Sequence, residues 1–426
     1  MPRTMSSLAL GFAFFLGALT ATADEAPWAR FRGPNGDGVA KNQDLPVKFD
    51  EKSGIAWKVP IMGLGNSSPV VWNENLFLQS ASDKGDQRFL LCLDSRTGKQ
   101  NWSRSLPGKK SPTHFKNTLA SSTPATDGES VFVSFWDGKE IILAAYSVKG
   151  EPIWHKNLGG FTSEHGAGAS PILYKDLVIL CNDIDKFEKG TEIPVLFPSK
   201  VLAFGKKTGN LVWEVQRESH RACYSAPFIL DQPGQAPQLI ITSTTAVNSY
   251  NPDNGSENWK WKWTFTAKSP LRTVCSSFAA DGLLFSFAGD GGGDRQMYAV
   301  SLDGDRKNVW QNKTDFPYVP CCLTSGQHIY FVNDRGFAGC FEIKTGKQVW
   351  LERLPEASFS GSPVLVDGKV YVGSEQGDVW VFAAEPTFKL LARNTLGETI
   401  RSTPAIADGR MYMRGQHHLY CVSKKQ

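Results

Sequence analysis

The sequence lacks the features that mark a membrane-spanning, nucleic-acid-binding or helical protein. Its N-terminal apolar run, residues 8–19, is too short for a helical membrane span, which needs about 20 apolar residues. No Lys/Arg tract is present, and 46 basic residues nearly balance 42 acidic ones, for a net charge of +4. No long amphipathic helical pattern occurs. We therefore expect no membrane span and no nucleic-acid partner, and we expect a monomer.

The first 23 residues have the pattern of an export signal. Arg3 supplies a positive charge, the short apolar run follows, and Ala21-Thr22-Ala23 offers the small residues that precede a cleavage site. An uncleaved N-terminal anchor is the alternative. No Cys follows the small residues, so no lipid-anchor site is expected. The pattern predicts a signal peptide over residues 1–23 and an exported protein, periplasmic or extracellular.

Eight cysteines in an exported protein suggest disulfides, but their positions weaken that interpretation. Three of them share one repeat position where other repeats carry small, mostly apolar residues, so we expect them to be unpaired core residues: Cys92, Cys340 and Cys421. The adjacent residues Cys321 and Cys322 leave several possibilities open. They could form a vicinal disulfide, fill a core as two small side chains, or pair with Cys223 or Cys275.

A short pattern recurs along the whole chain. Six anchors combine a small residue, Pro and an apolar residue: Ser68-Pro69-Val70, Thr123-Pro124-Ala125, Ser170-Pro171-Ile172, Ala226-Pro227-Phe228, Ser362-Pro363-Val364 and Thr403-Pro404-Ala405. Two degenerate copies lie between the fourth and fifth, at Ser276-Ser277-Phe278 and Cys321-Cys322-Leu323. Most anchors are followed by alternating strands, a Gly turn and a Trp. This periodicity predicts a β-propeller or a solenoid.

The two ends of the chain supply complementary parts of one repeat. The strand at the last anchor, Thr403-Pro404-Ala405, and residues 410–413 and 418–422 provide only three of the four strands of a blade. Residues 54–59 form an outer strand with no anchor before it. We expect this N-terminal strand to complete the C-terminal blade, because closure removes exposed sheet edges. The prediction is an all-β, eight-bladed β-propeller of four-stranded antiparallel blades, with seven blades as the alternative. The expected domains are an extended arm over residues 24–50, packed on the outside, and a single propeller over residues 51–426.

The Thr-Gly-x-x-x-Trp turns and the Ser-Pro anchors resemble the tryptophan-docking repeats of pyrroloquinoline-quinone-type propellers. The chain resembles in particular the small bacterial propellers related to the propeller component of the outer-membrane β-barrel assembly machinery. Residues 28–34 are similar to the start of secreted, quinone-like propellers from planctomycete-type bacteria. The resemblance implies that the Trp of one blade packs over the Gly turn of the next, which gives these residues a structural role: Trp57, Trp102, Trp154, Trp213, Trp259, Trp310 and Trp350.

The loops expected around the channel mouth carry the candidate binding residues. They are mostly cationic or aromatic: Lys116, Glu164, His165, His220, Arg221, Arg272, Asp290, Tyr318 and Arg401. Such a set predicts a pocket for a small anionic molecule or an acidic peptide. The alternative is a ring of solvated loop charges without a ligand.

Other local patterns are weaker. The Gly-rich residues 289–295 join two strands and do not fit a phosphate-binding G-x-G-x-x-G loop. Residues 182–185 offer oxygens for Ca²⁺ but lack the rest of an EF-hand. Glu164 and His165 are an acid and a base with no assignable nucleophile beside them. We therefore expect no catalytic residue and no metal ligand.

Two functions remain open to such a chain. The first is an exported scaffold that binds a protein partner or a small anionic ligand at its channel mouth, in cell-envelope or outer-membrane assembly, without a resident cofactor. The second is an enzyme that resembles pyrroloquinoline quinone-dependent alcohol or sugar dehydrogenases, with Ca²⁺. The chain is short for that class, has no C-x-x-C-H haem site, and does not match its calcium-binding residues. The scaffold is favoured, because a fold does not confer an activity.

Overall fold

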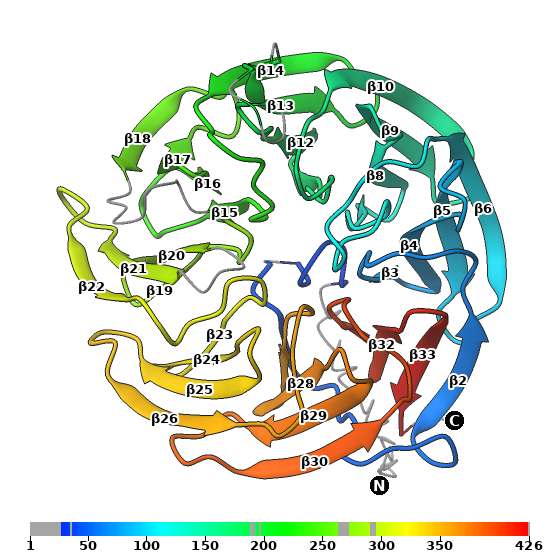
Figure 1. The fold of residues 1–426 in the computed structure, drawn as a ribbon, viewed down its shortest axis with the longest axis vertical. Helices are drawn as coiled ribbons and strands as arrows, with labels where there is room; N and C mark the ends of the chain where they lie inside the picture. The colour runs from blue at the N-terminus through cyan, green and yellow to red at the C-terminus, as the bar shows by residue number, and fades with distance from the viewer. Residues whose placement is uncertain are drawn as a thin grey trace, which may run out of the picture.

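The computed structural model describes residues 27–34, 36–187, 191, 193–195, 197–262, 272–289 and 295–424. The predicted signal peptide and Asp290 lie outside these residues. Within them the secondary structure is all β, and no helix long and apolar enough to cross a membrane occurs in these segments. Eight sheets stand around a central opening like the blades of a propeller (Figure 1). The predicted fold class is confirmed.

Blades 1 to 4 each contain four consecutive antiparallel strands, named in order from the inner to the outer strand. Blade 1 has β3 (Val70–Trp72), β4 (Asn75–Ala81), β5 (Gln87–Asp94) and β6 (Gln100–Pro107). Blade 2 has β7 (Ala125–Thr126), β8 (Ser130–Trp136), β9 (Glu140–Ser147) and β10 (Pro152–Gly160). Blade 3 has β11 (Ile172–Tyr174), β12 (Leu177–Asn182), β13 (Ser199–Gly205) and β14 (Leu211–Arg217). Blade 4 has β15 (Phe228–Leu230), β16 (Gln238–Thr242), β17 (Ala246–Tyr250) and β18 (Glu257–Lys262).

Blades 5 to 8 repeat this order, except that the outer strand of blade 8 comes from the N-terminal region. Blade 5 has β19 (Phe278–Ala280), β20 (Leu283–Gly289), β21 (Arg295–Ser301) and β22 (Asn308–Asn312). Blade 6 has β23 (Leu323–Ser325), β24 (His328–Val332), β25 (Phe337–Glu342) and β26 (Gln348–Arg353). Blade 7 has β27 (Val364–Val366), β28 (Lys369–Gly373), β29 (Asp378–Ala383) and β30 (Leu390–Thr395). Blade 8 has β31 (Ala405–Ala407), β32 (Arg410–Arg414), β33 (His418–Ser423) and β2 (Ile55–Pro60).

The N-terminal strand closes the ring as the sequence predicts. Strand β2 pairs antiparallel with β33, with Trp57 opposite Cys421, and the blue β2 lies beside the red β33 in Figure 1. Along β2, half-buried and exposed residues alternate, because this outer strand has one packed face and one solvent face. Middle strands such as β20 are buried throughout, because neighbouring blades cover both of their faces. The count is eight blades, not seven.

A circular set of hydrogen bonds joins the anchors of neighbouring blades. At seven of the eight junctions the backbone N–H of the anchor residue donates to the side chain of the next anchor: Ser68 to Thr123 (3.1 Å), Thr123 to Ser170 (2.9 Å), Ala226 to Ser276 (3.0 Å), Ser276 to Cys321 Sγ (3.2 Å), Cys321 to Ser362 (2.9 Å), Ser362 to Thr403 (3.0 Å) and Thr403 to Ser68 (3.0 Å). We call this set the anchor belt. It lacks one link, from Ser170, because the next anchor is Ala226, which has no hydroxyl. The recurrent small polar residue therefore couples each blade to the next.

Six of the seven tryptophans that the resemblance singles out lie against a turn of the next blade. Their indole N–H groups donate to backbone carbonyls there: Trp57 to Ser95, Trp102 to Val148, Trp154 to Lys206, Trp213 to Pro252, Trp310 to Ile343 and Trp350 to Glu385. Trp259 departs from this pattern. Its N–H donates to Gln238 of its own blade, and the Arg306 guanidinium lies 4.4 Å from its ring centre instead. The blade 5 turn around Gly304 is therefore free of the indole.

The N-terminal arm does not pack on the outside of the propeller, as the sequence led us to expect. It crosses the central opening, where Figure 1 shows the dark-blue segment. Its polar groups bond to the inner strands or anchors of five blades: the Trp28 and Ala29 carbonyls to Val71 and Thr126, Arg30 to Pro227, and Arg32 to Cys322 and Pro363. Strand β1 (Val39–Ala40) then pairs in parallel with β27. Trp28 is only 2% exposed. Arg30 and Arg32 drive this path, because buried guanidinium groups must find acceptors and unpaired carbonyls face the channel.

The anchor belt predicts opposite effects for two substitutions. Ala226→Ser supplies the missing acceptor for the Ser170 N–H and should raise the free energy of unfolding by about 0.5–1.5 kcal/mol. Ser362→Ala removes the acceptor of the buried Cys321 N–H and should lower it by about 1–3 kcal/mol. Urea unfolding followed by Trp fluorescence measures both. A destabilising Ala226→Ser, or a neutral Ser362→Ala, would show that the belt does not couple the blades.

The tryptophan packing predicts different costs for two glycine substitutions. Gly346 and Gly304 both have positive φ, at 68° and 53°, so Ala strains the backbone at either site. At Gly346 a Cβ would meet the Trp310 ring at 2.4 Å, whereas at Gly304 it would meet nothing within 4 Å. Gly346→Ala should therefore cost about 1–3 kcal/mol more than its matched control, Gly304→Ala. Equal midpoints of thermal unfolding for the two variants would contradict the packing role.

Candidate functional site

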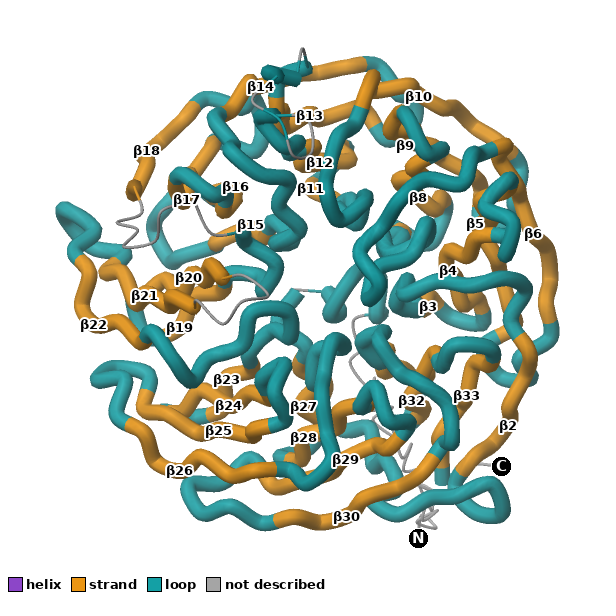
Figure 2. The backbone as a smooth tube through the Cα atoms, viewed as in Figure 1, coloured by secondary structure: helices purple, strands orange, loops and turns teal. Residues whose placement is uncertain are grey.

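The central opening forms a cup that is closed at one end. The cavity has a volume of about 450 Å³, and its wall includes belt residues such as Ser68, Thr123 and Ser362. Phe31 of the arm also lines it and packs against the core between blades 5 and 6. Loops crowd around the opening on the face turned to the viewer in Figure 2. The arm thus forms the base of the cup, the belt residues form part of its wall, and these loops form its mouth.

Among the described residues, four cationic side chains line the cup, against one carboxylate, Asp334. Lys116 and Arg401 lie on loops that lead into blades 2 and 8. Arg295 begins β21 and is 7% exposed. Arg335 is exposed and donates to the Thr314 carbonyl at 2.8 Å. The lining therefore has an excess of positive charge, which favours an anion.

The carboxylates near these cations are held by hydrogen bonds. Glu375, behind the lining, accepts from Lys116 at 2.7 Å and from Ser360 at 2.6 Å, and lies 3.4 Å from Arg401. Burial by itself raises the pKa of the Glu375 carboxyl, but the bonds from Lys116 and Ser360 outweigh it, so the pKa is lowered and the group is charged at neutral pH. These acids fix the positions of the cationic side chains.

Asp334 has the same role on the other side of the cup. Its carboxylate accepts from the backbone N–H groups of Tyr318 at 2.8 Å and Val319 at 3.1 Å, and lies 3.5 Å from Arg295. The Arg295 guanidinium is thus held beside Asp334, with its Nε buried and without a hydrogen-bond partner within the structure described.

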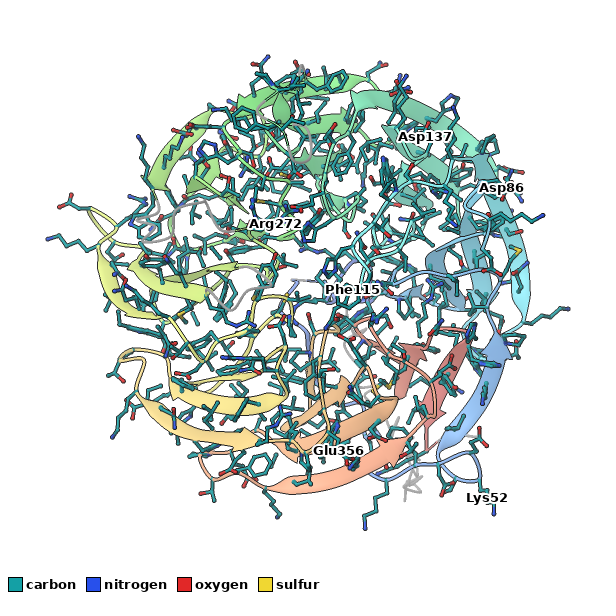
Figure 3. All side chains as sticks on the ribbon, in the orientation of Figure 1. Lys52, Asp86, Phe115, Asp137, Arg272 and Glu356 are labelled. Carbon is teal, nitrogen blue, oxygen red and sulfur yellow. The ribbon has the colours of Figure 1, made fainter. Side chains whose placement is uncertain are left out.

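Aromatic and imidazole rings form part of the mouth. His114 stacks on His165 with ring centres 4.9 Å apart, and Phe115 lies 4.4 Å from His114 on the other side. Phe115 is 76% exposed and lies near the centre of the ring in Figure 3. Tyr224 and Tyr318 line another part of the wall. These rings offer flat apolar surface beside the cations.

The two histidines are neutral at neutral pH. Burial, together with the charges of Arg272 and His114, lowers the pKa of His165 to about 4. Burial, with Lys116 and Arg272, also lowers the pKa of His114. The cations that face these rings therefore disfavour a further positive charge.

Arg272 lies behind the wall of the cup rather than on its surface. It is 1% exposed, its Nη2 lies 3.6 Å from Asp185 and 3.9 Å from Glu164, and its guanidinium lies 6.0 Å from the centre of the Tyr224 ring. In Figure 3 it is drawn beside the central opening. Asp185 also accepts from the backbone N–H groups of Glu164 and Ala222, at 2.6 and 2.7 Å. This buried pair holds two mouth loops together.

The structure brings together some of the predicted site residues and not others. Lys116, His165, Tyr318 and Arg401 line the cup, while Glu164 and Arg272 lie next to it. The other described candidates, His220 and Arg221, are not part of the lining. The His220 N–H donates to Thr244 and its carbonyl accepts from Lys186, so this loop packs against its own surroundings.

Several lining residues were not among the predicted set, including Phe31, Phe115, Tyr224, Arg295 and Arg335. The sequence could have indicated Phe115 as a lining residue, because it lies between His114 and Lys116 in a mouth loop. No sequence pattern indicated Phe31 as a lining residue, because the arm that carries it was expected on the outside of the propeller. Arg295 begins a strand, and only the tertiary structure shows where it lies.

The cysteines are all free thiols and all buried. Cys92, Cys340 and Cys421 lie in the core at matching strand positions, as expected. Cys321 and Cys322 do not form a vicinal disulfide; they lie with Cys275 in one apolar cluster between blades 5 and 6. Among the described residues, no group of three His, Cys, Asp or Glu side chains could hold a metal ion.

The low pKa of His165 predicts a pH-dependent stability. Between pH 6.5 and about 4 the unfolded chain binds a proton at this residue that the folded protein does not, so the free energy of unfolding falls as the pH falls through this window. The slope from one group is at most about 1.4 kcal/mol per pH unit, and less after solvent screening. His165→Phe keeps a ring on His114 but cannot titrate, so its thermal midpoint should fall less. Parallel curves for variant and wild type would contradict this assignment.

Comparison with known proteins places this fold in a family. A family model described as outer membrane protein assembly factor BamB matches residues 39–181, 92–352 and 335–425. No curated protein sequence matches the chain.

Among solved structures, BamB from Moraxella catarrhalis is similar over 86% of this chain and 99% of its own, with a TM-score of 0.62 and 12% identity. Quinohemoprotein alcohol dehydrogenase from Comamonas testosteroni is similar over 94% of this chain and 81% of its own, with a TM-score of 0.65 and 12% identity. At such identities the similarity shows the fold alone. The family model, in contrast, spans nearly the whole propeller, and the chain therefore belongs to the pyrroloquinoline-quinone-like β-propeller family of outer membrane protein assembly factor BamB.

Proposed function

We propose that this protein is an exported binding scaffold of the cell envelope whose cup binds an acidic ligand, either a small anionic molecule or the acidic end of a partner protein. The observation that carries the proposal is the one-ended cup, which four cations and one carboxylate line in the part of the chain that the structure describes. Its volume of about 450 Å³ lies within the ~300–1,000 Å³ of typical ligand sites. The envelope location rests on the export signal in the sequence and on the family.

Recognition, rather than catalysis, suits the chemistry of the cup. Asp334 and Glu375, which would be the candidate general bases, already accept hydrogen bonds from backbone or side-chain donors. The cations and aromatic rings at the mouth offer charge and flat apolar surface, which together bind acidic groups carried on an apolar body. A rigid propeller also holds these groups at fixed distances without a ligand.

The alternative is an enzyme of the pyrroloquinoline quinone dehydrogenase type. Support for it comes from the quinohemoprotein relatives among similar structures and from the cationic lining, which suits an acidic quinone. The residues fit the metal partner of that cofactor poorly. The described part of the chain brings no three metal-ligating groups together, and Asp334, the carboxylate of the lining, is bonded to two backbone N–H groups. We therefore derive no reaction step through this cofactor.

A pair of matched peptides tests the scaffold. A fluorescent Glu-rich hexapeptide should bind the purified protein, and its Gln-rich counterpart should not, because the binding energy comes from the cup's cations. Added salt should weaken binding. Arg335→Ala with Lys116→Met should weaken it at least tenfold in fluorescence anisotropy, whereas Lys347→Ala, the loss of an exposed cation on an outer turn, should leave it unchanged.

Equal binding of both peptides, or equal loss in the Lys347→Ala control, would contradict the proposal. Titration with pyrroloquinoline quinone, with and without Ca²⁺, tests the alternative. A ligand selective for the folded state raises the thermal midpoint by mass action. A saturable rise that depends on Ca²⁺ would favour the enzyme over the scaffold.

A further inference from the structure

A second, smaller cavity lies where the last blade meets the first. Its volume is about 240 Å³, well above the ~10–15 Å³ that a single water needs. Residues 64–66 of blade 1, residues 117–118 of the mouth and residues 414–416 of blade 8 contribute to its wall. It adjoins the cup, because Asn66, Phe115, Asn117 and Arg401 line both cavities. We call it the junction cavity.

Arg414 lines the junction cavity and is 1% exposed. Its guanidinium donates to the Gln79 carbonyl and, at 3.3 Å, to the Ser80 hydroxyl, which ties blade 8 to blade 1. Its Nε has no hydrogen-bond partner within the structure described. Two of the five N–H donors of an Arg are therefore used.

Gly65 makes room for this guanidinium. A Cβ at residue 65 would lie 2.8 Å from both Nη1 and Nη2 of Arg414, closer than such atoms approach in proteins. The backbone conformation does not explain the glycine, because Gly65 is not among the residues with positive φ. The close approach of the guanidinium does.

Within the described structure, Arg414 shares the lack of a carboxylate partner with the buried Arg30, Arg32 and Arg88, and differs in this from three other buried arginines. Arg217, Arg272 and Arg295 each lie within 4 Å of a carboxylate: Asp183 at 3.2 Å, Asp185 at 3.6 Å and Asp334 at 3.5 Å. Arg414 has no such ion pair in the described structure, and burial alone lowers its pKa to about 9. A buried charge without a counter-charge is costly, and an anion would reduce that cost.

The remaining lining offers donors and no acid among the described residues. Besides Arg401, which is already paired with Glu375, the polar side chains are neutral: Asn66, Asn117, Thr118, Thr399, Ser402 and Gln416. The side chains of Asn66, Asn117 and Ser402 donate to backbone carbonyls and that of Thr118 bonds to Ser121, whereas Thr399 and Gln416 make no side-chain hydrogen bond within the described structure. The nearest carboxylate of the adjoining turn, Glu398, packs beside Gly415 but accepts from the His417 N–H at 2.6 Å and pairs with His418 at 3.1 Å. Glu398 is thus occupied elsewhere.

We propose that the junction cavity is an oxyanion site, in which Arg414 binds a phosphate or carboxylate group that supplies its missing counter-charge. The Thr399 hydroxyl and the Gln416 amide donate to the remaining oxygens. The inference goes beyond the binding function of the cup, since Arg414 lines the junction cavity and not the cup. Because the cavities adjoin, one molecule that bears an anionic group could fill both.

Inorganic phosphate and acetate are the probes, with chloride at equal ionic strength as the reference. Phosphate or acetate should raise the thermal midpoint of the full-length protein, and isothermal titration should give saturable binding. Arg414→Met should weaken that binding at least tenfold. Arg335→Ala, which alters the cup alone, should bind phosphate like the wild type, so failure of the cup proposal and failure of this one are distinguishable.

Gln416→Glu is the second variant, because Arg414→Met also removes two bonds between blades. It places a carboxylate at the rim of the cavity with little change in shape. It should raise the thermal midpoint without any added anion and abolish the phosphate effect. The proposal is overturned if neither anion binds the wild type, if Arg414→Met binds as well as the wild type, or if Gln416→Glu retains full phosphate binding.

Discussion

Closure of the ring is the constraint on which the structure depends. Every anchor except Ser170 donates its N–H to the next anchor, and the link from the last anchor to the first forms only if blade 8 stands beside blade 1, where the Thr403 N–H meets Ser68. Blade 8 in turn is complete only when β2 pairs with β33. Segments more than 300 residues apart must therefore meet before the last blade is stable, and the loop-closure entropy is large. Two sets of contacts between blades offset this entropy. The tryptophans of the outer strands pack against neighbouring blades, and the anchor belt supplies hydrogen bonds around the channel.

The same closure determines where a ligand can bind. The ring leaves unpaired carbonyls of several blades facing the channel, and the arm carries Arg30 and Arg32 to meet three of them. The arm therefore stabilises the ring and closes one end of the channel with Phe31. A propeller without such a segment would present an open pore. With it, the mouth loops face a closed cup, and the junction of blades 8 and 1 leaves Arg414 beside a cavity.

The periodic parts of this structure could be predicted from the sequence, and the aperiodic parts could not. The eight anchors and the outer strand around Trp57, which has no anchor before it, predicted eight blades and the closure of the ring, because each sequence repeat forms the same local packing. The predicted path of the arm was wrong, because Arg32 bonds to residues 290 and 331 positions away and no local pattern encodes such contacts. Trp259 fits the sequence motif, but its indole does not bond to a turn of the next blade as the other six do, and the Arg306 guanidinium lies over its ring. In the site, Lys116 and Arg401 could be predicted as cations of the mouth loops. Arg295 and Arg414 lie on strands, and only the tertiary structure shows that they line cavities.

The distribution of charge around the channel separates two kinds of residue. The acids Asp185, Asp334 and Glu375 are each held by two or more donors, several of them backbone N–H groups of the mouth loops. A carboxylate so engaged positions a loop and is a poor base, because transfer of a proton to it would break the bonds that hold the loop. The cations paired with these acids are thereby fixed, and Arg295 and Arg414, which line the two cavities, each have a buried Nε without a hydrogen-bond partner in the described structure. Acids that hold the loops and the cations of the cup in place are consistent with the proposed function, because a fixed array of positive charge suits an anion.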